Sequence, residues 1–280
     1  MEVAHLGLGD WTWEPTVLLG IAALVAAYVL AWRRGLLSDD DDVSPWFSSP
    51  RTRRWYFAAG VLVGFVALTS PVDTGGDRYL FSLHMVQHLL LMMVAPPLCI
   101  LGIAAVRGVR LPGPPGPLRR AFATLVHPWA ATLIFSTVLL VWHIPALYDA
   151  TLTTEPIHVF EHLSFIAVGV IFWWPIVDPA RGRDTQRWVS PFAKIAMLVA
   201  SGIPPTVLGL IFTIAPHPFY DFYVRAPRLW GLSAVADQQL AGVVMFGAGN
   251  LIYFAAVVAV FWRVFGDPAR DEEEAHHAPG

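Results

Sequence analysis

Seven long apolar segments, separated by polar loops, constrain most strongly what this chain can fold into. They cover about residues 16–33, 55–71, 80–104, 128–147, 158–177, 192–215 and 238–264. A helix that crosses the hydrocarbon core of a bilayer needs about 20 mostly apolar residues. In lipid, backbone N–H and C=O groups must be paired within the protein, and a helix pairs its own. We therefore predict an all-α polytopic membrane protein, a bundle of seven transmembrane helices.

The composition supports this class and excludes others. Only 14% of the residues are charged and the mean hydropathy is +0.56, whereas a soluble domain carries roughly 25% charged residues. The apolar spans make membrane lipid an expected partner. There is no basic tract, so nucleic acid is not an expected partner. Residues 1–265 are predicted to form a single transmembrane domain. The polar stretch 266–280 is predicted to be a disordered cytoplasmic tail.

Basic residues are divided unequally between the two sides of the predicted bundle. One side holds 15 of the 18 Lys and Arg residues. They lie in or beside the loops 34–54, 105–127 and 178–191, or flank the last helix. The other side holds three, Arg78, Arg225 and Arg228. Loops rich in Lys and Arg stay in the cytoplasm. With seven helices, the N-terminus is then predicted to lie outside and the C-terminus inside.

Histidines gather on the predicted outer side. Ionisable residues within membrane helices are rare and usually mark a functional site. Two pairs have i,i+4 spacing, so the members of each pair share one helix face. The histidines that map to this side are His84, His88, His143, His158, His162 and His217. All but His217, which falls in the loop 216–237, are predicted to converge at one depth as a metal or cofactor site.

Thioethers and carboxylates accompany these histidines. Met85 and Met92 are seven residues apart on the helix of the first pair, and thioether ligands favour Cu(I). Glu161 lies beside His162, where it could orient an imidazole as an outer partner. Asp73, Asp77, Asp237 and His217 fall near the same membrane face. We treat these seven residues as possible accessory ligands or outer partners.

No catalytic motif is recognisable: the chain has no GxSxG, HExxH or P-loop sequence. The residues alone leave four functions open. The leading one is a non-enzymatic copper-handling protein. The others are a haem-binding membrane protein with axial histidines from facing helices, a metal-dependent membrane enzyme and a copper permease.

Four motifs resemble the CtaG-type cytochrome c oxidase assembly factors of bacteria. They are HMVQHLLLMMVAPP (84–97), WHIPALYD (142–149), HVFEHLSF (158–165) with FWWP (172–175), and DQQLAG (237–242). The resemblance covers about residues 55–262, in order along the chain. It implies a protein of the bacterial plasma membrane that is required to make an active haem–copper oxidase.

The resemblance further implies that the partner is a haem–copper oxidase subunit and that the cargo is copper. Combined with the methionines, it favours Cu(I), held by the five converging histidines and delivered to the copper centre of that subunit. Under this hypothesis the protein is not an enzyme, and transfer proceeds by ligand exchange within the membrane.

Overall fold

A computed structural model describes residues 5–37, 50–103, 116–177, 189–265 of the chain. Every regular element of these residues is helical. The elements are α1 (Pro15–Arg33), α2 (Pro50–Thr69), α3 (Pro71–Arg78), α4 (Phe81–Leu89), η2 (Leu90–Val94), α5 (Ala95–Ile103), α6 (Pro117–Leu125), α7 (Pro128–Trp142), α8 (Pro145–Thr153), α9 (Glu155–Val177), α10 (Pro191–Ile214), α11 (Asp221–Arg225), α12 (Ala234–Val243), η3 (Val244–Ala248) and α13 (Gly249–Phe265).

Six helices of the described residues are long and apolar enough to cross a membrane. The pair α7 and α8, which is bent by 73° at His143 and Ile144, makes a seventh if it is one span. This confirms the predicted all-α, multi-span architecture. The single-domain assignment and the outside–inside orientation stay predictions, and the tail 266–280 lies outside the described residues.

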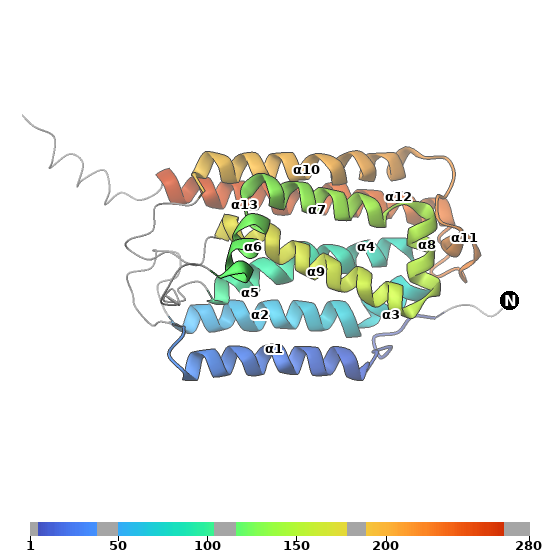
Figure 1. The fold of residues 1–280 in the computed structure, drawn as a ribbon. Helices are drawn as coiled ribbons and strands as arrows, with labels where there is room; N and C mark the ends of the chain where they lie inside the picture. Colours follow the sequence, from blue (N-terminus) through green and yellow to red (C-terminus); the bar gives the residue numbers. More distant parts are fainter. Residues whose placement is uncertain (1–4, 38–49, 104–115, 178–188, 266–280) are drawn as a thin grey trace, which may run out of the picture.

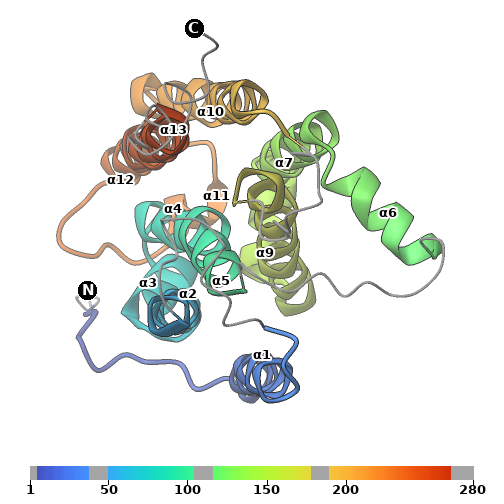
Figure 2. The ribbon, with the colours of Figure 1, turned by 90° about the vertical axis from the view of Figure 1, so that its left-hand side faces the viewer.

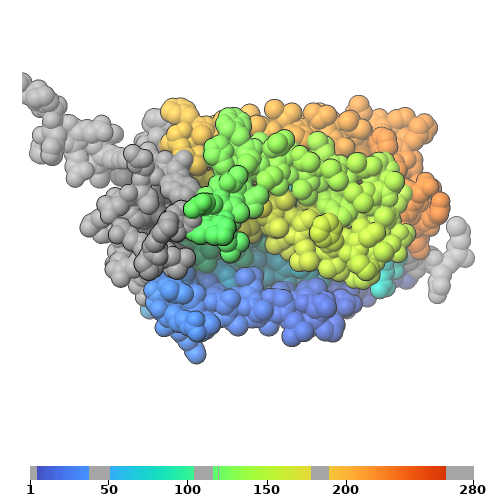
Figure 3. Space-filling model, in the orientation of Figure 1, coloured from blue at the N-terminus to red at the C-terminus, as the bar shows by residue number. Residues whose placement is uncertain are grey.

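The long helices run side by side, and α9 lies between α7 and α5 (Figures 1 and 2). The helix α2 packs on α5, α9 packs on α7 and α5, and α10 packs on α12 and α13. The core between them includes Phe135, Phe172 and Leu198, all fully buried. In contrast, α1 has no buried residue and lies along one edge of the molecule (Figure 3), as expected of a helix that faces lipid.

Two proline pairs shape the interior helices. A proline at position i removes the N–H that would bond the carbonyl at i−4. Pro96 frees the carbonyl of Met92, which accepts from Trp173 Nε1 at 3.3 Å. Pro205 likewise frees the carbonyl of Ser201, which accepts from the Tyr253 hydroxyl at 3.2 Å. At each proline pair, a side chain from a neighbouring helix therefore satisfies one freed carbonyl, as membrane helices require.

Single π-helical turns interrupt two spans. One, η2, separates α4 from α5, and the other, η3, separates α12 from α13. Such turns insert one extra residue and rotate the helix that follows, and they are frequent at functional sites. The turn η2 begins two residues after His88, and η3 contains Met245.

The contact between α9 and η2 depends on Gly169. A Cβ atom there would lie 2.7 Å from the carbonyl oxygen of Met92 and 2.8 Å from Pro96 Cγ. Backbone cannot yield as a flexible side chain would, so a larger residue must push the helices apart. A Cβ atom placed on Gly64, in α2, would have no neighbouring atom within 4 Å.

We predict that Gly169→Ala lowers the free energy of unfolding by about 1–3 kcal/mol, the usual magnitude of overpacking. Gly64→Ala should be neutral or stabilise by up to about 1 kcal/mol, because alanine restricts the unfolded chain. Thermal unfolding of both variants in detergent checks this. Equal melting temperatures for the two would contradict the close packing of α9 on η2.

Candidate metal centre

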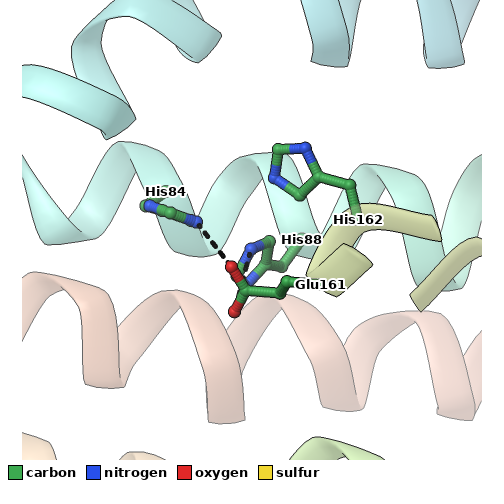
Figure 4. A group of neighbouring side chains, drawn as sticks. All are labelled: His84, His88, Glu161 and His162. Carbon is green, nitrogen blue, oxygen red and sulfur yellow. Dashed lines mark ion pairs between the residues drawn. The ribbon is translucent and has the colours of Figure 1, made fainter. Parts of the chain in front are cut away.

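Four buried side chains from two helices form the candidate metal centre. His84 and His88 come from α4, and Glu161 and His162 come from α9 (Figure 4). Each offers one ligand atom, and these four atoms all lie within 4.8 Å of one another. None of the four residues exposes more than 8% of its surface. The helical i,i+4 spacing brings the His84 and His88 rings together, with centroids 4.2 Å apart.

Glu161 faces both histidines of α4. Its Oε2 is 3.9 Å from His84 Nε2 and its Oε1 is 3.8 Å from His88 Nε2, as the dashed lines in Figure 4 mark. Both distances exceed hydrogen-bond length. Neither carboxylate oxygen has a hydrogen-bond partner within the described part of the chain. A buried carboxylate without partners is costly in a low-dielectric interior, and a bound cation would relieve that cost.

The tautomer of His84 follows from its contact with α11. The Tyr223 hydroxyl donates its one hydrogen to the Gly76 carbonyl at 2.7 Å. At 3.0 Å from His84 Nδ1, the same hydroxyl can therefore only accept, so Nδ1 carries the proton. Burial raises the pKa of Tyr223 well above its usual value, which keeps the phenol neutral. The lone pair of His84 Nε2 then points toward Glu161, ready to bind a cation.

A second group adjoins the first. His158, on α9, lies with its Nε2 3.4 Å from Asp77 Oδ1, and these two residues form a possible metal-binding set with His84. The His158 and His162 ring centroids are 4.2 Å apart. The structure thus brings together four of the five predicted histidines, with the Glu161 and Asp77 carboxylates between them.

His143, the fifth predicted histidine, lies beside these groups and belongs to neither. Its Nδ1 is 2.7 Å from the Leu139 carbonyl, and its Nε2 is 3.5 Å from the sulfur of Met85. Met92 and Met85 both line a cavity next to His88. These thioethers therefore lie near the cluster, on the side of the cavity that His88 also lines.

Asp73 accepts hydrogen bonds beside the cluster, whereas His217 lies outside it. Asp73 accepts from Gln87 Nε2 at 2.7 Å and from Thr12 Oγ1 at 2.8 Å. Gln87 lies between the two histidines of α4, so this contact fixes that helix against α3. His217 is exposed, and its carbonyl accepts from the Gln238 side chain.

Asp237 caps α4 from another helix. Its Oδ2 accepts from the Phe81 N–H at 2.7 Å, and its Oδ1 accepts from the N–H and hydroxyl of Ser82 at 3.0 and 2.6 Å. The first N–H groups of a helix have no partner within that helix. Asp237 supplies them with one and so fixes the start of α4, three residues before His84.

Tyr223 and Gln87 are site residues that the sequence reasoning did not select. Gln87 stands inside the motif of the first histidine pair, and its polar amide in an apolar helix was the available signal. Tyr223 lies 139 residues from His84 in a short helix outside the spans. No spacing rule connects such positions.

One comparison with known proteins identifies a family. The family model for the cytochrome c oxidase caa3 assembly factor matches residues 24–267. The chain is 28% identical over 217 residues to an uncharacterized protein of Mycobacterium leprae and 27% identical over 230 residues to one of Mycobacterium bovis. Each match covers 71% of this chain and 32% of the relative, so the chain spans about a third of their length. No solved structure matches the chain.

We predict that Asp237→Ala lowers the free energy of unfolding by about 1–3 kcal/mol, because the N–H groups of Phe81 and Ser82 at the start of α4 lose their acceptor. Asp221→Ala is the matched control: Asp221 also begins a helix, but its carboxylate is exposed and forms an ion pair with Arg225. The free energy of unfolding of this control should differ from the wild type by no more than about 0.5 kcal/mol. Chemical unfolding in detergent measures both, and a control loss as large as that of Asp237→Ala would contradict the capping role.

Proposed function

Because the chain belongs to the cytochrome c oxidase caa3 assembly factor family, we propose that it is a copper-handling assembly factor of the bacterial plasma membrane. It binds copper at the His84–His88–Glu161–His162 cluster and delivers it to the copper centre of a haem–copper oxidase subunit. The observation that carries the proposal is the convergence of three imidazoles and one carboxylate within 4.8 Å in a buried site. The protein acts as a carrier in this account, without a catalytic step.

Ligand chemistry supports copper as the cargo. Imidazole suits copper, zinc, iron and nickel, whereas calcium and magnesium prefer sites made only of oxygen ligands. Three neutral imidazoles with one carboxylate carry a single negative charge. A monovalent ion would make the buried site neutral overall, and neutrality matters because a net charge inside a membrane is costly. Cu(I) meets both requirements.

The spacing of the ligand atoms suits release as well as binding. Nitrogen and oxygen ligands bind such ions at about 2.0–2.2 Å, so four of them around one ion lie roughly 3.3–3.6 Å apart. The His84 and His88 nitrogens are 3.9 and 3.8 Å from Glu161 oxygens. The helices must therefore tighten slightly on the ion, which lowers the affinity and favours transfer to a partner.

The position of the cluster suits lateral transfer. It lies in the first turns of α4 and α9, near the end of the bundle where α3, α8 and α11 gather (Figure 1). The loop charges predict that this end faces outward. An oxidase subunit in the same membrane would meet the protein at this level, so ligand exchange needs no passage through water. The carrier would use one transmembrane domain, residues 1–265.

Haem binding is less well supported. Two axial histidines must stand on opposite faces of a flat porphyrin. Here the rings of His84, His88 and His162 pack against one another, with centroids 4.2–6.1 Å apart, and Phe165 covers His88 at 4.5 Å. A porphyrin would have to separate these side chains.

We predict that His84→Ala, His162→Ala and Glu161→Gln each weaken copper binding at least about 10-fold and lower caa3-type oxidase activity in membranes. Each removes a ligand from the cluster, and even outer partners of a metal change its affinity 10–100-fold. Copper content of the Cu(I)-loaded, detergent-purified protein and oxygen consumption of membranes measure the two effects.

His127→Ala is the control, because His127 is exposed at the start of α7, away from the cluster. It should bind copper and support oxidase activity like the wild type. Wild-type copper content in His84→Ala and His162→Ala would overturn the site. Loss of copper with normal oxidase activity would overturn the delivery role and leave the metal site standing.

A further inference from the structure

A cavity lined by methionines adjoins the histidine cluster. It has a volume of about 50 Å³, enough for an ion or more than one water molecule. Four of the six methionines of the chain line it, together with two histidines. These residues come from α4, η2, η3 and the α7–α8 bend, and they are Met85, Met92, Met93, Met245, His88 and His143.

Two acceptor atoms from residues that line this cavity lie in contact with each other. His143 Nδ1 is 2.7 Å from the Leu139 carbonyl, which can only accept, so Nδ1 carries the proton of the neutral imidazole. His143 Nε2 is then an acceptor, and it lies 3.5 Å from Met85 Sδ, which is also an acceptor. No hydrogen is available for this contact unless the buried imidazole becomes charged. A cation between the two atoms would instead be favourable for both.

The contact distance fits two ligands of one ion. Nitrogen and sulfur bind a tetrahedral ion at about 2.0–2.1 and 2.3 Å. Two such ligands then stand roughly 3.5 Å apart, the separation seen between His143 Nε2 and Met85 Sδ.

The fold holds His143 in place from both sides. The chain bends by 73° between α7 and α8 at this residue, and the Tyr220 hydroxyl donates to its carbonyl at 3.1 Å. Tyr220 exposes only 2% of its surface. The bend turns the imidazole inward, where Leu139 sets its tautomer. The imidazole is therefore oriented before any ion arrives, as a binding site requires.

We propose that this cavity is a second metal site, specific for a soft monovalent cation such as Cu(I), with His143 Nε2 and Met85 Sδ as its ligands. Thioether and imidazole ligands without a carboxylate favour soft monovalent ions over zinc or calcium. The other methionines complete a polarisable lining. The proposal rests on the proposed function in that both sites serve the same cargo.

His88 connects the two sites. Its Nε2 faces Glu161 at 3.8 Å in the cluster, and its ring lines the cavity. Neither of its nitrogens has a hydrogen-bond partner within the described residues. An ion can therefore move from the cluster to the cavity by ligand exchange at His88, without meeting water. No electron is transferred in this step.

Silver(I) tests the proposal, because it resembles Cu(I) and stays monovalent in air. Equilibrium dialysis of the detergent-purified full-length protein should show one more equivalent of silver(I) bound by the wild type than by Met85→Leu. Leucine keeps the size and apolar character of methionine. Met197→Leu is the matched control, because Met197 is equally buried on α10 and does not line the cavity. It should bind silver(I) like the wild type.

Zinc(II) separates this site from the cluster. Zinc binding should be unchanged in Met85→Leu and lost in His162→Ala, because zinc prefers imidazole and carboxylate. Silver(I) binding by Met85→Leu equal to the wild type overturns the second site. Zinc binding retained in His162→Ala overturns the cluster instead and leaves the silver result to stand.

Copper K-edge absorption of the Cu(I)-loaded wild type provides a test that needs no variant. A sulfur scatterer near 2.3 Å is expected from the Met85 thioether, at the usual metal–sulfur distance of about 2.3 Å. A spectrum with nitrogen and oxygen scatterers alone would contradict the proposal.

Discussion

The arrangement of the interior depends on Glu161, a buried carboxylate that faces imidazole nitrogens of His84 and His88 without a hydrogen bond to either. Its oxygens lie 3.8 and 3.9 Å from His88 and His84, too far for hydrogen bonds and close enough to share a cation. Inside a membrane such a group of acceptors is unfavourable by itself. The rest of the structure holds it together, and this is the physical basis for regarding it as a binding site.

Several contacts fix the cluster without joining it. Asp237 caps α4, Asp73 holds Gln87, and Tyr223 sets the tautomer of His84. Each of these groups comes from a different element and makes hydrogen bonds of normal length. Such outer contacts orient metal ligands and tune their affinity. A hydrogen bond also sets the tautomer of His143, in this case to the Leu139 carbonyl.

Much of the fold was predictable because lipid imposes simple rules. Apolar length marked the spans, and i,i+4 spacing placed His84 with His88 and His158 with His162 on shared faces. The role of Asp237 as a cap and the separation of His143 from the cluster were not predictable. Both depend on how distant helices are rotated. The π-turns that set part of this rotation have no clear sequence signature, and Pro145 marks the place of the bend but not its 73° angle.

Pulsed electron paramagnetic resonance tests metal binding at the cluster most directly, with one equivalent of Cu(II) as the paramagnetic stand-in for Cu(I), because imidazole binds both ions. The remote nitrogen of each coordinated imidazole modulates the electron spin echo, so the spectrum reports how many imidazoles bind, and the variants show which ones. The account predicts modulation from several imidazoles in the wild type, reduced in His162→Ala and unchanged in His127→Ala. A spectrum without imidazole modulation would contradict metal binding at the cluster.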